Sequence, residues 1–272
     1  MEVVVLDSAD AVAEYGAQRI IGLVKQNSAA VLGLATGRTP VALYKCLIRA
    51  YQQGVISFQD VTAFNLDEYV GIGEDDPLSF SAFMRRELFD AIDINLESTH
   101  IPKCPEGQNP FRVGEEYERS IELAGGIDLQ LLGIGTNGHI GFNEPTSSLA
   151  SRTRVKTLAG STINDNSLNT NKAGVSAELA VTMGIGTILD TRRVLLLATG
   201  EGKAGAISAA VEGPVSSMCP ASALQLHPTV TVVVDQAAAS QLQLIDYYLH
   251  VHQQQAAVQT RFGQLAVDQA LN

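Results

Sequence analysis

The sequence predicts an α/β protein with an open, mainly parallel sheet that carries helices on both faces. Three observations indicate this class: short runs that are apolar throughout, amphipathic stretches that alternate with them, and turn residues between the two kinds of segment. Strands that are apolar throughout are typical of parallel sheets, because such strands are buried on both faces. In open sheets of this kind, ligands bind beyond the carboxyl ends of the strands.

The predicted elements follow one another in a regular order. Residues 3–6 form a strand, and apolar residues at helical spacing predict a helix over 11–24 with a cap at Asp7-Ser8. A strand over 29–34 comes next, and Pro40 stands in the first turn of the following helix, where proline is tolerated. The other predicted strands cover 61–66, 127–132, 193–198 and 230–234, and the other predicted helices cover 79–91, 110–123, 203–211 and 237–250.

No break in composition, linker or repeat divides these elements. The sequence therefore predicts a single domain over residues 1–252, and 46% apolar residues in a chain of 272 supply a sizeable core. The glutamine-rich segment 253–272 has one apolar stripe at best, so we expect a C-terminal tail that is a frayed helix or mobile.

The charge balance excludes several classes of partner. With 18 Lys and Arg against 29 Asp and Glu, the chain has a net charge of −11 and lacks the clustered cations that nucleic acids and anionic membranes require. No apolar run reaches the ~18 residues that span a bilayer, so we expect a cytoplasmic protein. The three cysteines, Cys46, Cys104 and Cys219, include no CxxC pair and indicate neither a disulfide framework nor a zinc site.

Two glycine-rich segments, 133–138 and 200–205, match the GxGxxG pattern of dinucleotide-binding proteins. Residues that interrupt a helix follow the first, and no acid lies near the offset of ~20 residues where the ribose partner belongs. The acid after the second, Glu212, comes too early. We therefore predict no nicotinamide dinucleotide and no other cofactor.

These loops are still suited to phosphate. Thr36, Gly37, Arg38 and Thr39 open a helix, and the free N–H groups and dipole at a helix start favour an anion. Lys203 begins another helix and adds a second positive charge. The alternative is that both cations are ordinary solvated surface residues.

An acid and a histidine follow two of the predicted strands. Asp67 and Glu68 directly follow the third strand, where a carboxylate can face a cleft. The alternative is that the pair caps a helix or forms a solvated turn. His139 lies between glycines, and Glu144 is near enough along the loop to orient an imidazole and shift its pKa. Together with two phosphate loops, these residues fit proton transfer next to the carbonyl of a sugar phosphate, a chemistry that needs no metal.

Four strings at these positions carry a resemblance to a known family: ATGRTP at 35–40, FNLDEYVG at 64–71, GIGTNGHIGFNEP at 133–145 and SRTRVKT at 151–157. The chain resembles the glucosamine-6-phosphate deaminases, with few gaps from about Met1 to Tyr248. The resemblance implies a modified Rossmann-like fold and the conversion of glucosamine 6-phosphate and water to fructose 6-phosphate and ammonia. It also implies a place in amino-sugar catabolism and a homo-oligomer, for which a hexamer is favoured and lower states are the alternative.

The resemblance also implies roles, position by position. Asp67 would be the base that moves a proton between C2 and C1 of the sugar, and His139 would open the ring. Glu144 would hold and polarise His139, and the third member of the group is Asn137, which is Asp in some relatives. Because Asn carries no charge, the rise in the pKa of His139 would be smaller than beside Asp. The implied substrate-binding residues are Thr36, Gly37, Arg38, Thr39, Glu68 and Lys203.

Two positions depart from the family pattern. Leu168 stands where the family has an arginine that grips the phosphate, and Arg38 stands where it has Gly or Ser. We expect Arg38 to supply the guanidinium that Leu168 cannot. The alternative is that Leu168 weakens phosphate binding or accompanies a different amino-sugar substrate. Separately, a second site for the activator N-acetylglucosamine 6-phosphate is indicated by Ser147, Ser148, Arg154 and Lys156, for which the alternative is a basic exposed strand.

Other functions fit parts of the pattern. A deaminase for galactosamine 6-phosphate is the nearest, whereas a pentose phosphate lactonase shares the phosphate loop but lacks DEYVG followed by NGHIGFNEP. A sugar-phosphate sensor of a transcription regulator would carry a helix-turn-helix with a basic recognition helix. A silent sensor without DNA contacts would have no need of Asp67, His139 and Glu144 together.

Overall fold

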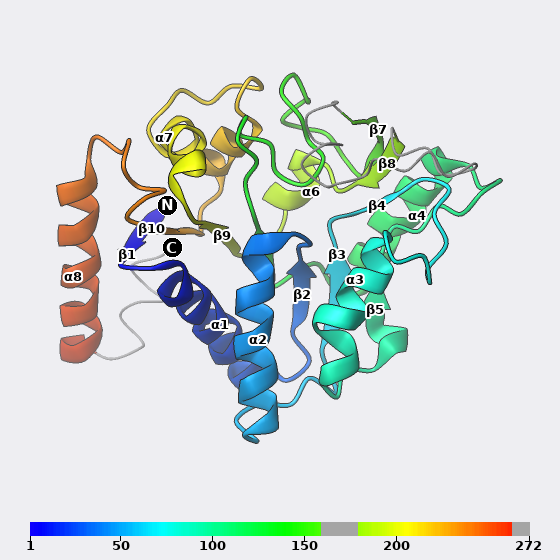
Figure 1. Ribbon diagram of the computed structural model, residues 1–272, viewed down its shortest axis with the longest axis horizontal. Helices are drawn as coiled ribbons and strands as arrows, with labels where there is room; N and C mark the ends of the chain where they lie inside the picture. The colour runs from blue at the N-terminus through cyan, green and yellow to red at the C-terminus, as the bar shows by residue number, and fades with distance from the viewer. Residues whose placement is uncertain (159–178, 263–272) are drawn as a thin grey trace.

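The structure is a computed structural model that describes residues 1–158 and 179–262, with side chains to residue 254 (Figure 1). Seven strands form one sheet in which every neighbouring pair is parallel. Across the sheet they are β1 (Glu2–Leu6), β10 (Val230–Asp235), β9 (Val194–Ala198), β6 (Leu129–Leu132), β2 (Val31–Leu34), β3 (Thr62–Asn65) and β5 (Thr99–His100). The strands β2, β6, β9 and β10 are buried at every position, so both faces of the sheet are covered. The predicted α/β class with a mainly parallel sheet is confirmed.

The helices of the structure are α1 (Ala9–Gln26), α2 (Arg38–Gln52), α3 (Phe80–Glu87), α4 (Pro110–Leu123), α6 (Ile185–Leu189), α7 (Ala204–Val211) and α8 (Ile245–Phe262). Five of them, α1, α2, α3, α4 and α7, lie close to the predicted positions, whereas the short helix α6 was not predicted. Ser8 caps α1 as predicted, since its side chain accepts the N–H of Ala11. In Figure 1, α1 and α2 lie side by side across one face of the sheet, and α8 packs at its β1 edge. Among the described residues, no helix is both long and apolar enough to cross a membrane.

The predicted helix over 237–250 is wrong in its position. Residues after β10 turn back on Asp235, whose carboxylate accepts the N–H of Ala238, and α8 begins only at Ile245. The carboxylate of Glu212 accepts the N–H groups of Gln243 and Leu244 at 2.8 and 2.9 Å, and so fixes where this helix starts. The helix then continues past the predicted boundary at 252, whereas residues 263–272 lie outside the described part of the chain.

A second, smaller sheet was not predicted. Its three antiparallel strands run in the order β4 (Asp67–Tyr69), β8 (Leu179–Thr182), β7 (Arg154–Thr157). Only Leu66 separates β3 from β4, so the chain passes from the large sheet to the small one just before Asp67. In the register of the small sheet, Thr182 pairs with Asp67 on one side and with Arg154 on the other.

The direction of chain progression reverses between β6 and β2. From β2 the chain moves outward to β3, whereas from β6 it moves the other way, to β9 and β10. A crevice at the carboxyl ends of such strands is the usual ligand site in open parallel sheets. The four loops that the sequence singled out follow β9, β6, β2 and β3, which are consecutive across the sheet. The fold therefore brings them to one edge.

Candidate active site

His139, Asn137 and Glu144 form a hydrogen-bonded group in the loop after β6. The amide nitrogen of Asn137 donates to Glu144 Oε2 over 2.7 Å, and Asn137 Oδ1 lies 2.7 Å from His139 Nδ1. Because an amide oxygen only accepts, Nδ1 of His139 carries the hydrogen, and Nε2 of the neutral ring is left as the acceptor. The Glu144 carboxylate, 3.6 Å from Nδ1, faces the imidazolium that forms when Nε2 takes a proton. This arrangement suits a general base that is held in one tautomer.

Close backbone contacts shape this loop. A side chain at Gly135 would collide with the His139 ring, because its Cβ would come within 2.1 Å of ring carbon Cε1. Gly138 adopts φ +83°, and a Cβ there would lie 2.6 Å from the sulfur of Cys219. Two of the three glycines that imitate a dinucleotide motif, Gly135 and Gly138, are thus required for the packing of the histidine and its turn.

Asp67 meets the same loop from β4. Its side chain is 5% exposed, and Oδ2 lies 3.5 Å from the hydroxyl of Thr182. A Cβ at Gly141, two residues after His139, would lie 3.3 Å from the same oxygen. Burial, and then the charge of neighbouring Glu68, raise the pKa of Asp67 to about 8. A carboxyl with a pKa near neutrality can both take and return a proton under ordinary conditions.

Glu68 points into a different environment from that of Asp67. Its carboxylate accepts the backbone N–H groups of Tyr69, Phe80 and Ser81, each at 3.0 Å, and the side chain is buried. Burial raises the pKa of Glu68, although these three hydrogen bonds oppose the rise. The carboxylate therefore caps the start of α3, which was the alternative interpretation of this residue, and its contact with substrate stays a prediction.

The predicted phosphate residues flank the histidine loop on both sides. Gly37, with φ +113°, begins α2 after β2, and no side chain caps that helix start. Arg38 is exposed at this start, and its side chain makes no hydrogen bond or ion pair with another described residue. Lys203 is half-buried at the start of α7, after β9. The two helix starts that carry Arg38 and Lys203 thus follow β2 and β9, the two strands that neighbour β6 in the sheet. Leu168 lies outside the described residues.

The predicted activator residues lie on the other side of the loop. Ser147 is buried, and its hydroxyl has no hydrogen-bond partner in the described structure, whereas Ser148 is exposed and Lys156 is partly exposed. Arg154 is half-buried, and its guanidinium donates to Asn143 Oδ1 over 2.9 Å. Arg154 is therefore tied to the loop that carries His139 and Glu144, which an ordinary exposed strand would not require.

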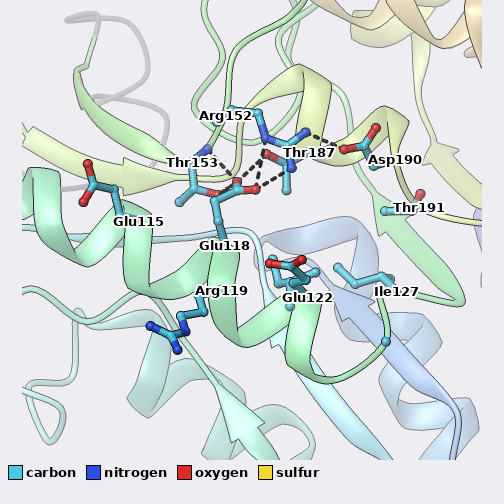
Figure 2. Close-up of a pocket in the computed structure, with 13 residues that line it drawn as sticks. Glu115, Glu118, Arg119, Glu122, Ile127, Arg152, Thr153, Thr187, Asp190 and Thr191 are labelled. Carbon is cyan, nitrogen blue, oxygen red and sulfur yellow. Dashed lines mark hydrogen bonds and ion pairs between the residues drawn. The ribbon is translucent and has the colours of Figure 1, made fainter.

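A separate surface cavity of about 900 Å³ lies beside α4 and α6 (Figure 2). Its centre is Glu118, which accepts hydrogen bonds from the Thr153 backbone at 2.7 Å, the Thr187 hydroxyl at 2.5 Å and Arg152 at 2.6 Å. Burial pushes the pKa of Glu118 upward, but the bonds from Thr153 and Thr187 outweigh it and lower the pKa. None of the predicted site residues lines this cavity. Glu118, Arg152, Thr153 and Thr187 bind one another in this cavity, so we assign this cluster a structural role.

Two further residues of the site are not identified by any pattern in the sequence. Asn143 belongs to the segment 133–145 that carries His139, and its fully buried amide donates to the carbonyls of Ile140 and Met183. Thr182 lies on β8, a strand of four residues that carries no motif. In the described ranges, no group of three or more His, Cys, Asp or Glu side chains is arranged to hold a metal ion.

Comparison with known proteins places the chain in a family. The family model for glucosamine-6-phosphate isomerases/6-phosphogluconolactonase matches residues 6–233, and the chain belongs to this family. It is 55% identical to the glucosamine-6-phosphate deaminase of Hahella chejuensis over 259 residues, which cover 95% of this chain and 98% of that one. It is 54% identical to the deaminase of Shewanella loihica over 265 residues, which cover 97% and 98%.

Two solved structures resemble this chain, one in both sequence and fold and the other in fold. A monomeric glucosamine-6-phosphate deaminase matches with a TM-score of 0.84 at 41% identity, covering 89% of this chain and all of that one. A 6-phosphogluconolactonase from Trypanosoma cruzi matches with a TM-score of 0.71 at 20% identity, covering 89% and 97%. The second likeness concerns the fold alone.

Proposed function

We propose that this protein is a glucosamine-6-phosphate deaminase, which converts glucosamine 6-phosphate and water to fructose 6-phosphate and ammonia. One observation carries the proposal: a buried aspartate with a raised pKa packs against the loop that holds the His139–Asn137–Glu144 group. Relatives more than 50% identical over nearly the whole chain carry the name of this activity. The reaction is the hydrolysis of a C–N bond with an internal aldose–ketose isomerisation.

The first step is the opening of the sugar ring. His139 Nε2 takes the proton of the anomeric hydroxyl, the bond between C1 and the ring oxygen breaks, and the ring oxygen receives the proton. Glu144 stabilises the imidazolium in between, because it lies 3.6 Å from Nδ1. Asn137 keeps the ring oriented for both transfers through its contact with Nδ1.

The second step is the proton transfer of the isomerisation. Ionised Asp67 removes the proton from C2 of the open-chain 2-ammonio aldehyde, and the C1 oxygen takes a proton from the ammonium group, which gives an enolamine. Asp67 then returns its proton to C1, and an iminium forms at C2 beside the new C1 hydroxyl. Water then adds at C2, and ammonia leaves. The base must hold a proton between its removal and its return, and a pKa of about 8 suits both halves of this cycle.

Substrate binding depends on the few cations near the crevice. We propose that the 6-phosphate binds at the start of α2, to Thr36, Gly37, Arg38 and Thr39, with Lys203 from the loop after β9. Helix N–H groups and the helix dipole favour a dianion at this place. The exposed guanidinium of Arg38, without a partner among the described residues, is available to take the part of the arginine that Leu168 replaces.

The test is the release of ammonia from glucosamine 6-phosphate by the purified protein. We expect steady release, stoichiometric with fructose 6-phosphate, and slower release from the galactosamine epimer. If neither substrate releases ammonia, the enzyme assignment is contradicted. If galactosamine 6-phosphate reacts faster, the protein is instead a deaminase for galactosamine 6-phosphate.

We also propose that the enzyme is a cytoplasmic homo-oligomer, with a hexamer favoured, that N-acetylglucosamine 6-phosphate activates. The contact between Arg154 and Asn143 supports the activation, because an anion bound at Arg154 would act on a residue of the histidine loop. The similar solved deaminase is monomeric, so the assembly needs its own measurement. Light scattering measures the mass, and velocity curves with and without the acetylated sugar phosphate measure the half-saturation. A monomeric mass would contradict the proposed oligomer, and an unchanged half-saturation would contradict the proposed activation.

A further inference from the structure

Thr182 ends β8 at the meeting point of the small sheet and the histidine loop. Its side chain is fully buried, and its backbone pairs with Asp67 of β4 and Arg154 of β7. The hydroxyl oxygen lies 3.5 Å from Asp67 Oδ2 and 3.4 Å from the carbonyl oxygen of Met183. It also accepts the backbone N–H of Phe142 over 3.1 Å.

The hydroxyl has one hydrogen and two acceptors for it. The distances to Asp67 Oδ2 and to the Met183 carbonyl differ by only 0.1 Å, and neither is short. The Met183 carbonyl also receives the amide of Asn143 at 2.8 Å, so it does not depend on the hydroxyl. An ionised carboxylate is a stronger acceptor than an amide carbonyl. The hydroxyl hydrogen is therefore expected to point to Asp67 when the Asp67 carboxyl is ionised, and to the Met183 carbonyl when it is protonated.

No cation among the described groups around Asp67 is placed to stabilise its anion, so the Thr182 hydroxyl matters for its ionisation. Glu68, the next residue, is itself an acid and disfavours the Asp67 anion. Tyr117 of α4 donates its hydroxyl hydrogen to backbone carbonyls, at 2.7 Å to Asn65 and 3.0 Å to His100. Arg154 lies a strand further away and binds Asn143. In the described structure no ion pair involves Asp67, and two neutral donors lower its pKa: the Thr182 hydroxyl and the backbone N–H of Phe142.

We infer that Thr182 is the positioning residue of the base Asp67, and that its hydroxyl hydrogen turns from the Met183 carbonyl to Asp67 Oδ2 when Asp67 is ionised. The inference rests on the proposed function, in which Asp67 alternates between the two states. The same hydroxyl holds the N–H of Phe142, and a Cβ on Gly141 would lie 3.0 Å from it. Thr182 therefore keeps the base in register with the loop of His139 while it responds to the proton of Asp67.

The test compares Thr182→Val, which keeps the shape and removes the hydroxyl, with Thr182→Ser, which keeps the hydroxyl. We expect the rising limb of kcat/KM against pH to move to higher pH by about one unit in the Val variant, since a hydrogen bond to a charged group is lost. At pH values below the pKa of Asp67, kcat/KM of the Val variant is then about tenfold lower than that of the wild type. Ser at 182 leaves the limb in place, as does Thr191→Val, a matched change of a buried threonine that donates to the Ile188 carbonyl.

A carboxyl titration separates this inference from the proposed function. The ¹³C signal of Asp67, assigned with Asp67→Asn, should titrate at higher pH in the Val variant than in the wild type, whether or not the protein releases ammonia. A variant that does not fold is replaced by Thr182→Ala, with the same expectation. Equal titration of Asp67 with and without the hydroxyl would overturn the inference, whereas a wild type that releases no ammonia would overturn only the proposed function.

Discussion

Two acidic side chains in different regions show how environment decides what a carboxylate does. Glu118, in the cavity beside α4 and α6, accepts short hydrogen bonds from two threonines and an arginine, and its pKa is lowered. Asp67, beyond the carboxyl end of β3, has one long contact to Thr182 among its side-chain partners, and its pKa is raised to about 8. The first holds the fold together, whereas the second is kept ready to exchange a proton.

Two histidines extend this comparison and give the largest expected effect. His227 is buried, with Nε2 2.6 Å from the Thr191 carbonyl and Nδ1 accepting the N–H of Thr229, so both nitrogens are occupied. His139 leaves Nε2 for the substrate. We expect His139→Asn to lower kcat about 10³-fold with little change in the melting temperature, because a positioned base is lost. The matched His227→Asn should lower the melting temperature and keep kcat, and the opposite pattern would refute the assignment.

Removing the charge of Asp67 should stabilise the fold. Its pKa is about 8 in the folded protein against 3.8 in the reference state, so ionisation costs stability progressively as the pH rises between these values. Asp67→Asn should therefore unfold at higher denaturant than the wild type, by an amount that grows by several kcal/mol between pH 4 and pH 8. Urea unfolding at pH 4 and pH 8 measures the difference. A gap that does not widen with pH would show that Asp67 is not destabilised by burial.

Glu118→Gln should have the opposite sign. The pKa of Glu118 is lowered in the folded protein, so its contribution to stability is present above the unfolded pKa and is lost on acidification. We expect a loss of about 2 kcal/mol at pH 7, the usual size for hydrogen bonds to a charged group. The same urea experiment at low pH should show a smaller loss, and kcat should stay within twofold of the wild type. A large loss of kcat would place this cavity in the reaction.

Arg38→Ser is expected to have the smallest effect of the four. Losing one guanidinium at the start of α2 should raise KM for the sugar phosphate about tenfold and leave kcat unchanged, because the phosphate binds equally in substrate and transition state. Lys45→Ser, an exposed cation further along the same helix, is the control and should change neither constant. An unchanged KM in the Arg38 variant would disprove the compensation for Leu168.

The sequence was most informative where structure depends on neighbouring residues. The apolar strands, the Ser8 cap and the four loops follow from local patterns, and parallel strands align their carboxyl ends without further information. It failed where a distant side chain decides the outcome. Glu212 sets the start of α8, and Thr182 reaches Asp67 from a strand 115 positions later in the chain. No local pattern around Asp67 identifies that partner, and none distinguishes Asp67 from the capping residue Glu68.

The most direct test of the central claim is the reaction of wild type and Asp67→Asn with glucosamine 6-phosphate in D₂O at pH 8. The wild type should release ammonia and form fructose 6-phosphate with deuterium at C1, since Asp67 exchanges its proton with solvent during part of its cycles. The folded variant should do neither at a rate above about one thousandth of the wild type. Ammonia release by the variant at a rate near that of the wild type would contradict the claim that Asp67 is the base.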